Sequence, residues 1–296
     1  MPLLSIIRRE DRSLGLTLGA YALLLVLIVG HFVAAGELSF GRKPWENFKR
    51  TATELSQPSF LNVWFGTERL EYRSDDGRVL RVENQREREA EFLAALGRAA
   101  WTTFQVATLG SLLAALLALP FGLAAARNMQ QPPWLARPAR LMLDICRSIH
   151  TLVFGLLFVS VVGLGAMAGV LAIAAHSFGT YGKLYAESIE SVDARLIQSG
   201  VALGLTPLQT LVHGLWRTML PRWISVHLYV WEFNVRDSTV LGLIGAGGLG
   251  LLVSEAVSLF QWGRLATILL AIVALVIAFD TLSRSIRHTI NRPREQ

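Results

Sequence analysis

Long apolar runs separated by short charged segments dominate the chain. Runs of about 20 residues, the length that crosses a bilayer as a helix, occupy 14–35, 101–126, 141–163, 165–183 and 264–282. A further apolar helix begins at Arg222 and reaches a glycine-rich patch at 242–250, which a short helix at 251–262 follows. The pattern predicts an all-α polytopic membrane protein with about six transmembrane helices.

Basic residues indicate which loops face the cytoplasm. Short loops rich in Arg and Lys remain on the cytoplasmic side of a membrane, and the loop at 127–140 contains three arginines and no acidic residue. The segment before Leu14 and the C-terminal tail are also basic, so both termini are predicted to be cytoplasmic. A cleaved signal peptide is the alternative for the first run, whose apolar core is too long for one.

This topology divides the chain into five parts. They are a cytoplasmic N-terminus (1–13), a first transmembrane helix (14–35), an extracytoplasmic insertion (36–98), a transmembrane domain (99–284) and a cytoplasmic tail (285–296). In the insertion, a three-residue loop at Asp75–Gly77 predicts a β-hairpin that pairs Tyr72 with Leu80 and Leu70 with Val82.

A polar interruption at 187–221 lies between two apolar runs, on the same side as the basic loop. It is too polar for lipid and too apolar to stand free in water. We expect one helix at 188–199, a break at Gly204–Pro207 and a second helix at 208–220. The segment, within a loop at 184–221, is interpreted as a docking element for another protein.

Several classes of chemistry are disfavoured by the sequence. The net charge of +6 is explained by arginines that flank the apolar runs, rather than by nucleic-acid binding. The sequence G-x-G-x-x-G at 245–250 follows no strand, so its glycines predict close helix packing or a broken backbone. A Walker A motif, metal-ligand spacing and a catalytic constellation are not found in the sequence, so no catalytic residue, metal or cofactor is expected, and energy must come from a partner.

Charged residues inside the apolar runs have two interpretations. Glu232 and Arg236 share one helix face, and Arg236 lies about 22 Å along a helix from Pro221. They form a structural ion pair, or Arg236 faces a pathway for an anion. Asp144 and Arg147 allow the same two interpretations, although Arg147 lies close enough to the membrane surface to reach water.

Two stretches carry a resemblance to a known family. The loop at 187–221 is similar to the cytoplasmic "EAA" loop of binding-protein-dependent ABC importer permeases. Residues 147–193 and the run E-x-N-V-R-x-x-T-V-L-G-L-x-G-A-G-G at 232–248 resemble the phosphonate and phosphite permeases. The chain departs from the family at three places. Gln198-Ser199-Gly200 replaces Glu-Ala-Ala, Arg217 replaces a proline, and His150-Thr151 replaces a Pro-Glu or similar pair after Arg147-Ser148-Ile149.

The resemblance implies a type I importer permease for a phosphonate or related phosphorus oxyanion, which couples to a separate ATPase. It implies two ATPase subunits that bind ATP and Mg, a second permease subunit (a homodimer is expected) and an external solute-binding protein. Coupling to the ATPase is assigned to Glu187, Glu190, Asp193, Gln198, Gly204 and Leu205. The pathway or gate is assigned to Arg236, Glu232, Asn234, Arg147, Gly245, Gly247 and Gly248.

Three alternatives to this function remain open. A permease of the same superfamily could carry another solute, such as methionine or a different oxyanion. An intramembrane enzyme would need convergent catalytic groups inside the apolar runs. A secondary transporter working alone would show repeated halves and no cytoplasmic docking loop.

Overall fold

The structure is a computed structural model that describes 2–36, 43–66, 69–73, 79–129, 131–193, 195, 199–200, 202–206, 209, 214 and 216–290. It divides into two units, Met1–Thr53 and Glu54–Gln296. The first unit contains α1 (Pro2–Ala34) and most of α2 (Pro44–Leu55). Residues Leu14–Ala34 of α1 form an apolar helix long enough to cross a membrane.

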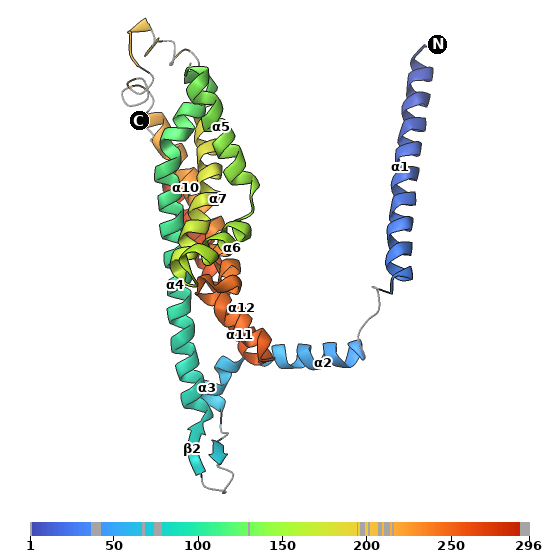
Figure 1. Ribbon diagram of the computed structural model, residues 1–296, viewed down its shortest axis with the longest axis vertical. Helices are drawn as coiled ribbons and strands as arrows, with labels where there is room; N and C mark the ends of the chain where they lie inside the picture. Colours follow the sequence, from blue (N-terminus) through green and yellow to red (C-terminus); the bar gives the residue numbers. More distant parts are fainter. Residues whose placement is uncertain are drawn as a thin grey trace. The chain divides into compact units, whose positions relative to one another are not determined.

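The second unit is a helical bundle preceded by short elements (Figure 1). The short elements are η1 (Ser59–Leu61), α3 (Asn62–Phe65), β1 (Arg69–Arg73) and β2 (Val79–Asn84). The bundle consists of α4 (Gln85–Ala125), η2 (Arg127–Met129), α5 (Pro133–Ser148), α6 (Thr151–Val162), α7 (Ala166–Glu190), α10 (Trp216–Leu241), η4 (Gly242–Ala246), α11 (Leu249–Ser258) and α12 (Trp262–Ile290).

The central helix of the bundle is α7, which packs on α4, α5, α6 and α10. Glycines permit the closest approaches: a Cβ added to Gly122 of α4 would lie 2.9 Å from the carbonyl oxygen of Gly182 on α7. Small residues of this kind let helix backbones meet in membrane proteins, where van der Waals packing drives association. The α4–α7 pair therefore forms a rigid support for the residues of α10.

Length and apolarity allow three helices of the described chain to cross a membrane individually, namely α1, α4 and α12. Two bent pairs, α5 with α6 and α10 with α11, raise the number to five. The sixth predicted span requires the 25-residue helix α7. This helix is not among the candidates by length and apolarity, and its polar residues include Lys183 and Glu187. The all-helical membrane fold was therefore predicted correctly, although the apolar test alone does not give six spans.

The predicted third span, 141–163, is not one continuous helix. The chain bends by 90° between α5 and α6, at Ile149 and His150. The His150 side chain caps α6 by accepting the N–H of Leu152 at 3.2 Å, and His176 Nδ1 lies 2.8 Å from the Ile149 carbonyl oxygen. These bonds satisfy backbone groups that the break would otherwise leave unpaired.

The two strands of the insertion pair antiparallel, in a register that differs from the predicted one. Leu70 lies opposite Glu83 and Tyr72 opposite Arg81, one residue away from the expected partners. An irregularity between Tyr72 and Arg73 shifts the ladder, since a bulge places an extra residue in one strand. The predicted loop Asp75–Gly77 lies outside the described residues.

Candidate functional site

A groove of about 410 Å³ lies between α7, α10 and the end of α5. Three residues that the sequence singled out, Arg147, Asn234 and Glu187, lie along it. The remaining lining residues are His176, Ser177, Thr180, Lys183, Leu184, Tyr229, Val230 and Phe233. The groove thus combines residues predicted for the pathway with one predicted for coupling.

Sequence reasoning missed the contribution of α7 to this groove. His176, Thr180, Lys183 and Glu187 recur every three to four residues, which places them on one face of the helix. Their spacing was a usable signal, but His176, Thr180 and Lys183 lie inside the run 165–183, which was interpreted as an apolar span. Which element this face meets depends on packing with α5 and α10, and periodicity does not report that packing.

Buried polar bonds fix the base of the groove. Asn234, which is 1% exposed, accepts a hydrogen bond from Ser177 Oγ at 2.9 Å through Oδ1. Its Nδ2 donates to Ser111 Oγ on α4 at 2.8 Å. One side chain of α10 is therefore held between α7 and α4. Because both serines are also buried, this network orients the amide and joins the three helices.

Two cations of the groove have carboxylate neighbours. Arg147 Nε donates to Asp144 Oδ1 at 2.9 Å, and Lys183 Nζ lies 3.9 Å from Glu187 Oε1. All four side chains are between 41% and 54% exposed, so the protein encloses neither ion pair.

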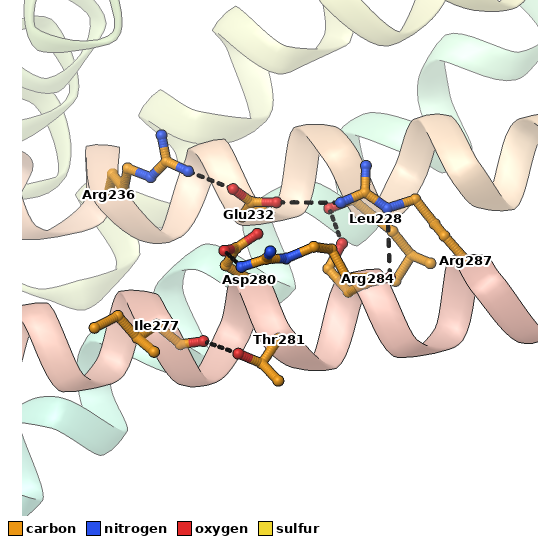
Figure 2. A network of polar contacts seen from close by, with 9 residues as sticks. Leu228, Glu232, Arg236, Ile277, Asp280, Thr281, Arg284 and Arg287 are labelled. Atoms are coloured by element: carbon orange, nitrogen blue, oxygen red, sulfur yellow. Dashed lines mark hydrogen bonds and ion pairs between the residues drawn. The ribbon is translucent and has the colours of Figure 1, made fainter.

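Glu232 and Arg236 do not line the groove; they form part of a second polar network, which α10 shares with α12 (Figure 2). Arg236 pairs with Glu232, whose other carboxylate oxygen lies 3.5 Å from Arg287 Nη2. The Glu232 carboxylate therefore lies next to two guanidinium groups. The Arg236 side chain is 51% exposed, whereas Glu232 is 13% exposed. The ion pair predicted from their spacing is present, and the network retains a positive charge.

The glycine-rich patch forms a break between α10 and α11, which bend by 56°. Gly245, Gly247 and Gly248 have φ values of +99°, +80° and +72°, a region that other residues rarely adopt. Thr103 on α4 secures the break, because its Oγ1 accepts the N–H of Leu249 at 2.9 Å. The helices on either side of the patch support the broken-backbone interpretation over a nucleotide-binding loop.

The residues predicted for coupling begin at the end of α7, which continues to Glu190. The predicted start of the first loop helix at 188 is therefore wrong, since residues 188–190 belong to α7. Glu190 Oε1 accepts the N–H of Arg127 at 2.8 Å, and Asn128 Nδ2 donates to the Ile189 carbonyl at 2.8 Å. These bonds join the end of α7 to the short turn η2.

The rest of the loop contains a helix cap and a turn. Asp193 Oδ1 accepts the N–H of Arg195 at 2.9 Å, as a residue that caps a helix does. Gly204 has φ +70°, and the N–H of Leu205 bonds to the Gly200 carbonyl. The break predicted at Gly204–Pro207 is thus present at Gly204, and Gln198 lies outside the described residues.

The end of the second loop helix was also predicted incorrectly. α10 begins at Trp216 and passes through Pro221, where a helix terminus was expected. Met219 and Trp223 are 0% and 5% exposed and pack with Tyr185 and Leu143. Burial of these side chains on both sides of Pro221 offsets the one backbone bond that a proline removes.

A family model described as "Binding-protein-dependent transport system inner membrane component" matches residues 118–294, more than half of the chain. The chain belongs to this family. It therefore is a multi-pass membrane permease subunit of a binding-protein-dependent transport system. The groove, the broken helix and the loop after α7 all lie within the matched residues.

Curated relatives and solved structures agree with this assignment. The phosphite transport permease PtxC of Stutzerimonas stutzeri is 38% identical over 185 residues, or 62% of this chain and 67% of its own. A putative phosphite transport permease of the same organism, HtxC, is 38% identical over 193 residues, 65% of this chain and 68% of its own. A chain of the inward-facing MetNI methionine ABC transporter matches this chain with a TM-score of 0.61 at 21% sequence identity. The match covers 68% of this chain and 99% of the MetNI chain, which shows the type I importer permease fold.

Proposed function

We propose that this permease forms the membrane pathway of an ATP-driven importer for a phosphonate or related phosphorus oxyanion. The two relatives named above as phosphite permeases support this class of solute. The single structural observation that carries the proposal is the groove in which Arg147 and Lys183 lie beside hydroxyl and amide groups. Cations and hydrogen-bond donors are the groups that oxyanions select.

The proposed assembly supplies what this chain lacks. Two ATPase subunits bind ATP and Mg²⁺ and contact the end of α7 and the loop that follows it. The coupling surface consists of Glu187, Glu190, Asp193, Gln198, Gly204 and Leu205. A second copy of the chain completes the pathway, and an external binding protein delivers the solute. Both termini lie in the cytoplasm. This chain performs no bond chemistry itself.

The location of the groove suggests how ATP hydrolysis moves the solute. Glu187 lines both the groove and a smaller pocket that contains Arg127, Arg140 and Glu190. A push on the loop after α7 would act through the end of this helix, since Glu190 is bonded to the turn at Arg127. Because Asn234 bonds α10 to both α7 and α4, these helices would move together, and the groove would change in width at the end of α5. The moving group thus includes the helix that carries Lys183.

Arg236 is proposed as a second positive charge that eases the passage of an anion. Its network with Glu232 and Arg287 contains two guanidinium groups and one carboxylate. A fixed positive charge lowers the free energy of an anion most strongly in a low-dielectric path. The glycine break at Gly245, Gly247 and Gly248 provides a hinge near the same end of α10.

The test is phosphonate uptake by cells that express the complete importer. Arg147→Gln and Arg236→Gln should each lower the uptake rate at least tenfold, while Arg147→Lys should retain more of it than Arg147→Gln. The matched control is Arg284→Gln, because Arg284 of α12 is also paired four residues away, with Asp280, and does not line the groove. Unchanged uptake in both test variants, at normal membrane levels, would refute the proposed pathway residues.

A further inference from the structure

The helix α2 has the pattern of a helix that lies in a membrane surface. Its apolar residues Trp45, Phe48, Ala52 and Leu55 recur every three to four positions and therefore form one stripe. Charged and polar residues occupy the opposite face, with Arg50 near its centre. Helices with aromatic residues on one face and basic residues on the other settle at the boundary between headgroups and acyl chains.

The stripe is open along the first part of α2. Trp45 and Phe48 are 64% and 61% exposed, and their rings stack at a centroid distance of 5.6 Å. Lys49 Nζ lies 5.5 Å from the Trp45 ring centroid, at the edge of the stripe. A lysine in this position can cover an aromatic ring with its stem while its ammonium group reaches water. Two large aromatic side chains are thus stacked on each other and exposed.

A candidate span precedes α2 in the chain, and the segment after α2 contacts a second candidate span. Before α2, the apolar helix Leu14–Ala34 ends only a short segment upstream of Pro44. After it, Ser59 Oγ and Thr267 Oγ1 lie 3.1 Å apart, and the N–H of Phe60 donates to the same Thr267 oxygen at 3.2 Å. Thr267 lies in the first turns of α12, a second candidate span.

Exposed aromatic residues of the second unit also have the pattern of a membrane boundary. Trp64 and Phe65 of α3 and Phe260, next to the start of α12, are 62%, 76% and 73% exposed. Aromatic side chains of this kind gather where lipid headgroups meet the hydrocarbon core. The segment that follows α2 is therefore attached at the level of a membrane surface.

We propose that α2 lies in the lipid headgroup region on the side of the membrane where α1 ends, with Trp45, Phe48 and Ala52 inserted among the acyl chains. The occupant of the stripe is lipid. Its polar residues include two acidic and two basic side chains, Glu46, Glu54, Lys49 and Arg50, so zwitterionic lipid suffices. The proposal does not depend on the transported solute.

Site-directed spin labels on the full chain test this placement. Single cysteines at Phe48 and Ala52 report on the stripe, and single cysteines at Asn47 and Arg50 serve as the matched polar-face controls. All are made in a Cys146→Ser background, because Cys146 is the only native cysteine. The labelled proteins are reconstituted in phosphatidylcholine nanodiscs, and the accessibility of each label to oxygen and to a water-soluble nickel chelate is measured.

The proposal predicts oxygen accessibility several-fold higher, and nickel accessibility several-fold lower, at Phe48 and Ala52 than at Asn47 and Arg50. Ala52 also serves as the milder substitution if the Phe48 variant fails to fold. Equal nickel accessibility on both faces would overturn the proposal, because α2 would then stand in water. Low accessibility to both reagents at Phe48 and Ala52 would also overturn it, since a protein surface would then cover the stripe.

Discussion

Replacement of Asn234 by alanine should destabilise the bundle through loss of two buried hydrogen bonds. The bonds to Ser177 and Ser111 measure 2.9 and 2.8 Å, and all three side chains are at most 1% exposed. Each such bond contributes about 0.5–1.5 kcal/mol in proteins and about 0.6 kcal/mol on average between membrane helices. With the cavity left by the amide, a loss of about 2 kcal/mol in the free energy of unfolding is expected.

The measurement is reversible unfolding in mixed detergent micelles, followed by circular dichroism. Asn47→Ala is the matched control, because it removes the same atoms from an exposed position of α2 and should change stability by less than about 0.5 kcal/mol. A double-mutant cycle with Ser177→Ala should give a coupling energy of about 0.5–1 kcal/mol. If Asn234→Ala costs no more than Asn47→Ala, the account of the network is wrong.

Two further predictions concern the helix break and the coupling end. Gly250→Ala should lower the free energy of unfolding by more than about 2 kcal/mol and abolish uptake, because the added Cβ would overlap the Thr239 carbonyl. The control Gly19→Ala adds a Cβ in open space, so stability and uptake should stay within error in the same unfolding and uptake assays. Glu190→Ala should lower the solute imported per ATP hydrolysed several-fold, because the bond to the Arg127 N–H is lost, while Glu190→Gln retains an acceptor. A tolerated Gly250→Ala, or equal coupling in the two Glu190 variants, would contradict these interpretations.

The apolar runs predicted the membrane fold because hydropathy over about 20 residues is a local property. The 90° bend at Ile149 and His150 was not predictable in this way, since neither residue is a strong helix breaker. The bend depends on His176, which contacts the Ile149 carbonyl from α7. The hairpin register failed for a similar reason: a bulge at Arg73 is not visible in the alternation of side chains.

The site was predictable where spacing along one helix decides it. Glu232 and Arg236 lie four residues apart and pair as expected, but the second partner of Glu232, Arg287, comes from α12. Arg147 was considered together with Asp144, and Asn234 came from the family motif at 232–248. Only the packing of α5 and α10 against α7 places Arg147 and Asn234 along one groove. Long-range packing, rather than residue type, separates the groove from the Arg236 network.

The central claim is most directly tested by purifying the chain from its native membrane with its associated ATPase and binding protein, and reconstituting the complex in liposomes. The account predicts ATP-dependent uptake of a phosphonate or phosphite, inhibited by other phosphorus oxyanions and unaffected by methionine. Uptake of methionine or another solute in preference to every phosphorus oxyanion, with an active ATPase present, would contradict it.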